Sequence, residues 1–126
     1  MAMGSIVLAD DDEDLRAIYA PLLRSAGHTV REAFGGVEAL RLVREHRPDL
    51  LILDVWMPGC NGFEVLEGLR HDPASGTLKV LMLSNLGDAD TRLVCFEMGA
   101  ADYLVKGVGL AELRARVAAL LVVPPA

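Results

Sequence analysis

The sequence predicts a single α/β domain in which helices cover both faces of a parallel five-stranded sheet. Five short apolar runs rich in β-branched residues alternate with five segments in which apolar residues recur at helical spacing. Glycine and proline separate most of these segments, as turns and loops require. Strands that alternate with helices in this way form doubly wound parallel sheets with right-handed crossovers.

Each predicted strand is one of the five apolar runs. The runs lie at Ser5–Ala9, His28–Glu32, Leu50–Asp54, Lys79–Ser84 and Ala101–Lys106. The third and fourth contain the almost continuously apolar stretches LLIL and VLML. Such stretches are typical of central strands that are buried on both faces.

Five helices are predicted from apolar stripes whose members lie three or four positions apart. The stripes are Leu15, Ile18, Leu22 and Ala26; Val37, Leu40 and Val43; Phe63, Leu66 and Leu69; Leu93, Cys95 and Phe96; and Leu110, Leu113, Val117, Leu120 and Leu121. Pro21 lies inside the first helix. Because proline removes a backbone donor, we expect it to kink or locally open that helix.

The composition is that of one folded domain. The chain has 126 residues, 52% of them hydrophobic, and a mean hydropathy of +0.35. No apolar segment reaches the roughly 20 residues of a membrane span, and the first residues lack the pattern of a signal peptide. Cys60 and Cys95 lie far apart, as expected for reduced thiols in a cytoplasmic protein. We therefore expect one cytoplasmic domain over residues 1–126, in which residues 122–126 begin a linker or form a tail.

The net charge of −6 argues against direct binding of nucleic acid, because phosphate backbones require clustered basic residues. The acidic residues are instead concentrated in the run DDDED at positions 10–14. Asp12, Glu13 and Asp14 are expected to begin a helix, where acidic side chains favour the helix dipole. Asp10 and Asp11 follow a strand directly and need a different explanation.

Polar side chains gather where the predicted strands end. These residues are Asp10, Asp11, Asp54, Ser84 and Lys106. In a doubly wound sheet the carboxyl ends of the strands form the ligand site, so the sequence predicts three carboxylates, one hydroxyl and one ammonium at a single edge. Clustered carboxylate oxygens suit Mg²⁺. Taken singly, each residue has a simpler explanation, such as a turn cap for Asp54 or a surface lysine for Lys106.

The motifs LADD, LDVWMPGCNG, LSN and DYLVK resemble, in order and spacing, the receiver domain of bacterial two-component response regulators, a CheY-like domain. The resemblance covers essentially the whole chain. It implies a flavodoxin-like (βα)5 three-layer sandwich with strand order 2-1-3-4-5. It also implies a regulatory phosphoacceptor rather than an enzyme.

The resemblance assigns roles to individual residues. Asp54 would accept a phosphoryl group from a phosphohistidine of a sensor histidine kinase or phosphotransfer protein. Asp10 and Asp11 would hold Mg²⁺, or alternatively Mn²⁺, together with Asp54 and the main-chain carbonyl of Trp56. Lys106 would supply a second cation to the phosphoryl oxygens.

The resemblance further implies a switch. Ser84 would hydrogen-bond the phosphoryl group, and Tyr103 would then move from an exposed toward a buried position. The surface of the fourth helix, last strand and last helix would change, and so control a target, an output domain or a homodimer formed on phosphorylation. The positions that form ion pairs between subunits in DNA-binding regulators with winged-helix outputs match Arg92, Glu97, Asp102, Glu112 and Arg116, although a solvated charged surface explains these residues nearly as well. No direct nucleic-acid or membrane binding is expected of this domain.

Two departures from the family pattern stand out. Gly107 follows Lys106 where a cis proline is usual, so we expect a looser loop there. Trp56 and Leu86 stand two positions beyond Asp54 and Ser84, at positions that influence water access in this family. Because both are apolar, we expect a comparatively long-lived acyl phosphate.

Three other functions agree with parts of the pattern. A degenerate receiver would act only as a protein-binding module. A Mg²⁺-dependent phosphatase would use Asp54 or Asp10 as its nucleophile, but such enzymes usually carry a cap or a second domain. A flavin-binding domain would need a phosphate-binding loop after the first strand, and the sequence lacks one there.

Overall fold

The computed structural model describes residues 4–85 and 87–122. Its strands are β1 (Ser5–Ala9), β2 (Thr29–Ala33), β3 (Leu50–Asp54), β4 (Lys79–Ser84) and β5 (Asp102–Val105), and its helices are α1 (Glu13–Ser25), α2 (Gly36–His46), α3 (Gly62–His71), α4 (Ala89–Glu97) and α5 (Leu110–Leu120). All neighbouring strands are parallel, in the order β2-β1-β3-β4-β5. The predicted flavodoxin-like α/β fold and strand order are confirmed. None of the described helices has the length and apolar character needed to cross a membrane.

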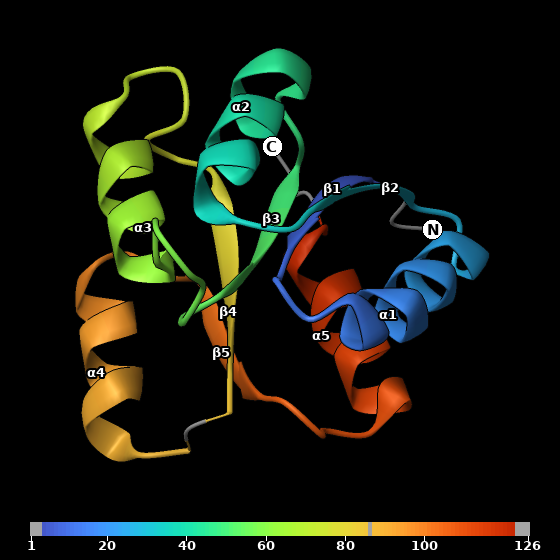
Figure 1. Ribbon diagram of the computed structural model, residues 1–126. Coiled ribbons are helices and arrows are strands. Elements are labelled where there is room, and N and C mark those ends of the chain that lie inside the picture. Colours follow the sequence, from blue (N-terminus) through green and yellow to red (C-terminus); the bar gives the residue numbers. More distant parts are fainter. Residues whose placement is uncertain (1–3, 86, 123–126) are drawn as a thin grey trace.

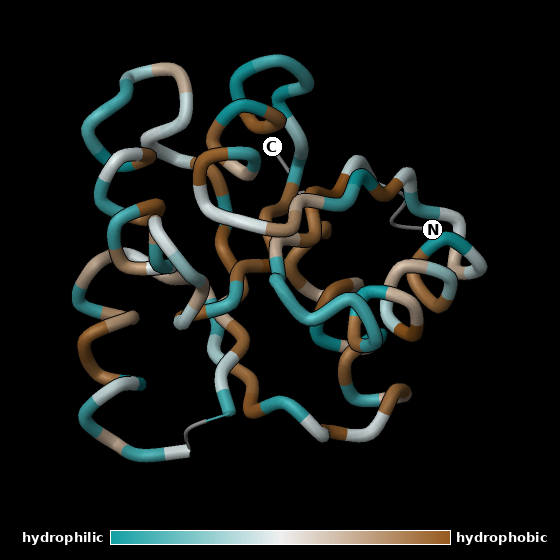
Figure 2. Tube along the Cα trace, in the orientation of Figure 1, coloured by the Kyte–Doolittle hydropathy of each residue, from teal (hydrophilic) through white to brown (hydrophobic). Residues whose placement is uncertain are grey.

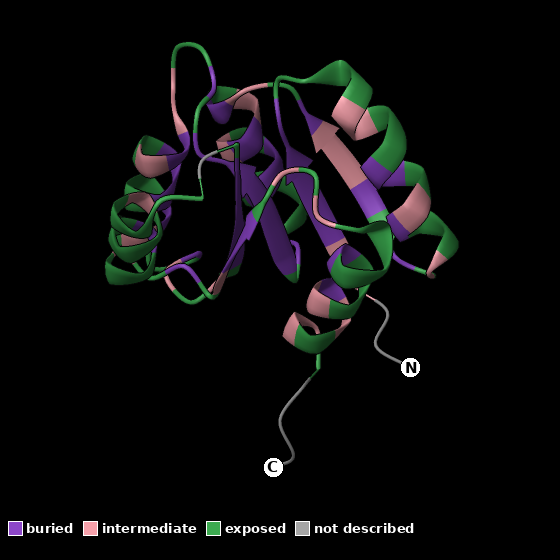
Figure 3. Cartoon of the chain, turned by 90° about the horizontal axis from the view of Figure 1, so that it is seen from below, coloured by how far each residue is buried: buried purple, intermediate pink, exposed green. Residues whose placement is uncertain are grey.

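The sheet is the middle layer of three (Figure 1). Helices α1 and α5 cover one face, and α2, α3 and α4 cover the other. Alternating residues of each strand enter two separate cores: Ile6 and Leu8 pack with α1 and α5, whereas Val7 and Ala9 pack on the opposite side. Figure 2 shows the apolar strands enclosed by more polar outer segments. Figure 3 shows the buried sheet beneath the exposed outer surfaces of the helices.

The predicted limits of β1, β3 and β4 are correct. The second strand begins and ends one residue later than predicted, at Thr29 and Ala33. The fifth is shorter at both ends, at Asp102 and Val105. The expected linker or tail at 122–126 lies outside the described residues except for residue 122.

The predicted buried faces of four helices are partly wrong. In α1, Ile18 is 53% exposed, whereas Tyr19, Ala20 and Leu23 are buried. In α4, Leu93 and Phe96 are exposed, and only Cys95 is buried. Val37 and Leu110 are exposed as well. Helical spacing alone cannot decide between two apolar stripes that run along the same helix, and packing on the sheet selects one of them.

Helix α1 continues from Glu13 to Ser25 through Pro21. It begins as predicted, with the Asp12 carboxylate accepting hydrogen bonds from the backbone N–H groups of Asp14 and Leu15 at 3.0 and 3.2 Å. An Asp at this position stabilises a helix by about 1 kcal/mol. The cap fixes the turn that carries Asp10 and Asp11.

Candidate functional site

Three carboxylates meet at the carboxyl edge of the sheet. Asp10 follows β1 and is 0% exposed, Asp54 ends β3 and is 3% exposed, and Asp11 is exposed. One oxygen from each of these side chains lies within 4.8 Å of the others. The structure therefore brings together the three acidic residues that were predicted at the strand ends.

Lys106, directly after β5, joins the carboxylates of the two buried acids. Its Nζ lies 2.8 Å from Asp10 Oδ2 and 3.1 Å from Asp54 Oδ2. The ammonium group is itself largely buried, so little water screens these contacts. Asp10, Asp54 and Lys106 form one charged unit.

Backbone amides hold the other oxygens of the same two acids. The N–H of Asp12 donates to Asp10 Oδ1 at 2.9 Å, and the N–H of Trp56 donates to Asp54 Oδ1 at 3.3 Å. In both cases the donor lies two residues after the acid, the pattern of an Asx turn. No motif in the sequence indicated these two amides. An Asp that ends a strand, or directly follows one, before a loop is the signal that could have found them.

The protonation of Asp54 reflects this crowded site. Burial, and then the negative charge of Asp10, raise the pKa of Asp54 to about 7, although the charge and hydrogen bond of Lys106 oppose the change. Burial lowers the pKa of Lys106, but its hydrogen bond to Asp10 and the charges of Asp10 and Asp54 outweigh that effect and raise it. The lysine therefore remains charged, while a cation is needed to keep Asp54 fully ionised at neutral pH.

The site fits a divalent metal ion. Three carboxylates and one ammonium leave a formal charge of −2. The buried Asp10 Oδ2 contacts Lys106 but accepts no well-oriented hydrogen bond from any described residue. The two buried carboxylates share the single ammonium of Lys106, so a further cation would offset the negative charge that remains. Asp10, Asp11 and Asp54 are the residues that could hold this ion.

The structure also locates the other predicted site residues. Ser84 ends β4 and is fully buried, and its carbonyl accepts a hydrogen bond from the N–H of Lys106 at 2.7 Å. Tyr103 is 4% exposed and packs in the same apolar cluster as Met82. The structure thus has Tyr103 in the buried position, not in the exposed position expected before phosphorylation. Ser84 and Tyr103 keep their switch roles as predictions.

The loop after Lys106 is a tight turn. The N–H of Val108 donates to the carbonyl of Val105 at 3.2 Å, and Gly107 has a φ of 93°. No peptide bond among the described residues is cis. A positive φ at the third position of a turn favours glycine and is closed to proline. Gly107 therefore gives this loop a different backbone conformation from the cis-proline loop that is usual in the family.

Trp56 follows Asp54 at this edge of the sheet, and two of the predicted ion pairs lie on the α4-β5-α5 surface. Trp56 is 54% exposed and packs edge-on against Phe63, with ring centroids 5.6 Å apart. Leu86, the second residue expected to limit water access, lies outside the described residues.

On the α4-β5-α5 surface, Arg116 contacts Asp102 at 2.8 Å and Glu112 at 2.9 Å within the same chain.

The fold and the acidic pocket together define a class of signalling domain. The chain belongs to the response regulator receiver domain family, which it matches over residues 6–118. A domain of this class is a regulatory phosphoacceptor rather than an enzyme that turns over a substrate.

Individual relatives show how the domain is used elsewhere. The chain is 43% identical to the transcriptional regulatory protein PrrA of Mycobacterium tuberculosis over 116 residues, 92% of this chain and 49% of PrrA. It is 37% identical over 119 residues to the DNA-binding dual master transcriptional regulator RpaA of Synechocystis, covering 94% of this chain and 49% of RpaA. The chain thus spans about half the length of the curated relatives it matches. The crystal structure of the chemotaxis protein CheY4 of Vibrio cholerae is similar over 94% of this chain and 99% of that chain, with a TM-score of 0.88 and 28% identity.

Asp54 is expected to make the stability of the metal-free protein depend on pH. Its pKa is about 7 in the folded protein against 3.8 for an ordinary Asp. Between these pH values the folded state binds more protons than the unfolded state, so stability falls as the pH rises, by at most about 1.4 kcal/mol per pH unit. Urea unfolding in the presence of a chelator should show that the advantage of Asp54→Asn over the wild type grows from pH 5 to pH 7.5.

The comparison with Asp54→Asn isolates the Asp54 contribution. Burial lowers the pKa of His28, which also makes stability depend on pH, but His28 is present in both proteins and its effect cancels. A difference in unfolding free energy that stays constant with pH would contradict the prediction.

Gly62 is expected to be essential for the geometry around Asp54. Its N–H donates to the carbonyl of Val55 at 2.8 Å, and an added Cβ would overlap the carbonyl oxygen of Asp54 and lie 2.9 Å from Val55 Cα. Because backbone atoms cannot yield as side chains do, Gly62→Ala should cost about 3 kcal/mol in unfolding free energy. Chemical denaturation checks this. The control is Gly35→Ala, whose Cβ meets nothing within 4 Å, and an equal loss in the two variants would refute the explanation.

Proposed function

We propose that Asp54 is the phosphoacceptor of a two-component system, and that its phosphorylation controls a partner through the α4-β5-α5 surface. One observation carries the proposal: the buried Asp54 carboxylate lies 3.1 Å from the Lys106 ammonium and within 4.8 Å of oxygens of two further carboxylates. A cation beside a carboxylate nucleophile stabilises the charge that develops on a transferring phosphoryl group. Family membership supports the same role.

The transfer takes place at one oxygen of Asp54. A carboxylate oxygen attacks the phosphorus of a phosphohistidine, a P–O bond forms, and the P–N bond breaks with its electron pair left on the imidazole nitrogen. The product is an acyl phosphate on Asp54 and a histidine that recovers its proton. Lys106 holds a phosphoryl oxygen, and the N–H of Trp56 keeps the carboxylate oriented.

The metal in this proposal is Mg²⁺, with Mn²⁺ as an alternative. Asp10, Asp11 and Asp54 would hold it together with the main-chain carbonyl of Trp56. Hard oxygen ligands with retained water suit Mg²⁺, and when bound it would neutralise charge on the phosphoryl oxygens. The charge of −2 left by the protein side chains supports a divalent ion at this place.

The signal would pass from Asp54 to the opposite side of β4. A phosphoryl group adds about −1.5 to −2 charges, and the Ser84 hydroxyl would hydrogen-bond one of its oxygens. Ser84 and Tyr103 lie on neighbouring strands β4 and β5, so a shift of Ser84 would favour one of two positions of Tyr103. The outcome is a changed α4-β5-α5 surface.

The partners follow from this role. The donor would be a sensor histidine kinase or a phosphotransfer protein in the cytoplasm. The receiver of the signal would be a separate target, an output domain or a second copy of the chain. The names of PrrA and RpaA favour control of transcription, and the Arg116 ion pairs lie on the surface such an output would use.

Incubation with acetyl phosphate and Mg²⁺, followed by intact mass measurement, tests the proposal. We expect one phosphoryl adduct that disappears when a chelator is present. Metal binding without any adduct would instead assign the chain to degenerate receivers that only bind proteins. Continuous hydrolysis of phosphomonoesters would assign it to the phosphatases.

The acyl phosphate is expected to be long-lived because Trp56 shields it. The indole ring lies two residues from Asp54 and is held by its edge-on contact with Phe63. Trp56→Asn should speed the loss of the phosphoryl group several-fold by admitting water, whereas Phe34→Asn, at another exposed aromatic residue, should not. A phosphate-release assay measures both rates. Loss of half the phosphoryl group from the wild type within seconds would contradict the expectation.

A further inference from the structure

A cavity of about 490 Å³ lies at the edge of the sheet opposite Asp54. The ends of α2 and α5 and the segment that joins α3 to β4 surround it. Asp49 directly precedes β3, whereas Asp54 ends that strand, so the cavity and the acidic pocket occupy opposite ends of β3. Its volume is within the range of about 300–1,000 Å³ that is usual for small-molecule sites.

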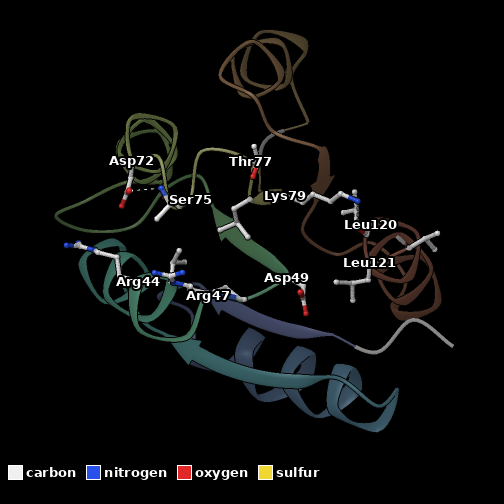
Figure 4. A pocket seen from close by; sticks show the side chains of 14 residues that line it. Arg44, Arg47, Asp49, Asp72, Ser75, Thr77, Lys79, Leu120 and Leu121 are labelled. Carbon is white, nitrogen blue, oxygen red and sulfur yellow. Dashed lines mark hydrogen bonds between the residues drawn. The ribbon is translucent and has the colours of Figure 1, made fainter. Parts of the chain in front are cut away.

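Apolar side chains form half of the cavity lining, and charged or polar side chains form the other half. The apolar lining includes Val43, Pro48, Leu78, Leu120 and Leu121. Figure 4 shows Arg44 and Arg47 on the same side as Asp72 and Ser75, with Lys79, Asp49 and Leu121 on the other side. Such a cavity would accept a molecule with an apolar body and a charged end.

The two acids of the cavity already have hydrogen-bond donors. Asp49 Oδ2 accepts from the N–H of Ser5 at 2.8 Å, and Asp72 Oδ1 accepts from the N–H of Ala74 at 2.9 Å. These bonds offset part of the charge of each carboxylate. The acids therefore act in the structure as acceptors for loop amides.

The basic residues of the cavity form fewer strong interactions with other protein groups than the two acids do. Neither Arg44 nor Arg47 forms an ion pair with a carboxylate of the described residues, and Arg44 has only a long hydrogen bond of 3.4 Å from Nε to the carbonyl of Leu40. Lys79 Nζ donates to the carbonyl of Leu120 at 2.8 Å, a neutral acceptor. The lining holds three cations and two carboxylates, a formal charge of +1 in a chain whose net charge is −6.

Arg47 occupies a backbone position where glycine would be more favourable. It ends α2 with φ 45° and ψ 64°, in the left-handed region, and its N–H donates to the carbonyl of Val43 at 2.9 Å. An arginine in this conformation is strained relative to glycine, and strained residues cluster at binding sites. Arg47 thus lines the cavity from a backbone conformation that is less favourable for arginine than for glycine.

We infer that this cavity binds a small amphipathic organic anion. Its apolar body would pack against Val43, Leu78 and Leu121, and its acidic group would face Arg44 and Arg47. A guanidinium binds a planar acidic group through two parallel hydrogen bonds, and an apolar wall excludes the water that would weaken them. The site would give the domain an input that is separate from phosphorylation.

Titration with the fluorescent anion 8-anilinonaphthalene-1-sulfonate tests this inference on the full chain. We expect saturable binding of one molecule per chain. Arg44→Gln should weaken it roughly tenfold, the loss of one charge-assisted interaction. The matched control is Arg41→Gln, one turn earlier in α2 and outside the cavity, which should leave the affinity unchanged. The uncharged analogue N-phenyl-1-naphthylamine should bind all three proteins alike.

Arg47→Gly separates binding from folding. Glycine relieves the left-handed backbone, so this variant should melt at the same temperature as the wild type or higher, yet bind the anion more weakly. A loss of affinity in a protein of equal or greater stability cannot come from unfolding. Equal affinity of wild type, Arg44→Gln and Arg47→Gly would overturn the inference, as would the absence of saturable binding.

The chain beyond residue 122 provides a second check, because Val122 also lines the cavity. A chain that ends at residue 122 should bind the anion as the full chain does. Much tighter binding after removal of residues 123–126 would assign the cavity to that segment of the chain and would also overturn the inference.

Discussion

Asp54→Asn should remove every trace of phosphorylation by acetyl phosphate while leaving the fold intact. The amide keeps the shape of the carboxyl group but has no nucleophilic oxygen of comparable strength, so no acyl phosphate can form. Burial, and then the charge of Asp10, raise the pKa of Asp54 to about 7, and the neutral Asn avoids the cost of a buried charge, so this variant should be at least as stable as the wild type at pH 7.5. Intact mass and thermal melting measure the two effects.

The combination of lost phosphorylation and retained stability is the decisive outcome for Asp54. A phosphoryl adduct on Asp54→Asn at the wild-type yield would show that another residue is the acceptor. The exposed Asp11, with an oxygen within 4.8 Å of Asp54, would then be the first to examine.

Asp11→Ala should slow metal-dependent phosphorylation by roughly tenfold or more, because it removes one of the three carboxylates proposed to hold the metal. Asp14→Ala is its matched control. Asp14 is also exposed and three residues further on, but it lies in the first turn of α1 and not in the carboxylate cluster. Fluorescence of Trp56, the only tryptophan of the chain, gives a readout of metal binding that does not depend on phosphorylation.

The two variants test whether the acidic run DDDED has two parts with different roles. Asp10 and Asp11 would act at the metal, whereas Asp12 caps α1 and Asp14 lies in its first turn. Equal loss of Mg²⁺ affinity in Asp11→Ala and Asp14→Ala would mean that general negative charge, rather than coordination, attracts the ion.

The fold and the members of the acidic site could be predicted because they depend on short-range patterns. Apolar runs gave the limits of β1, β3 and β4, and the rule that strand ends share one edge placed Asp10, Asp54 and Lys106 together. The helix faces could not be predicted as well. Helix α1 carries both Ile18 and Tyr19 on apolar stripes, and only packing against the sheet shows that Tyr19 is the buried one.

Contacts between segments far apart in the chain could not be predicted from sequence patterns. Arg70 in α3 donates to the carbonyls of Gly76 at 3.1 Å, Leu78 at 2.9 Å and Gly99 at 2.7 Å, and so joins three segments. No spacing rule relates an arginine to carbonyl groups 6, 8 and 29 residues away. The pKa of Asp54 likewise depends on burial and on the exact approach of Asp10, which only the folded structure defines.

The central claim is that the phosphoryl group is carried by Asp54, beside Lys106. Its most direct test is reduction of the phosphorylated protein with borohydride, which converts an acyl phosphate to an alcohol, followed by peptide mass mapping. We expect a single reduced residue, at position 54, and none when Mg²⁺ is withheld. Reduction at position 10 or 11, or a stable adduct that borohydride does not reduce, would contradict the claim.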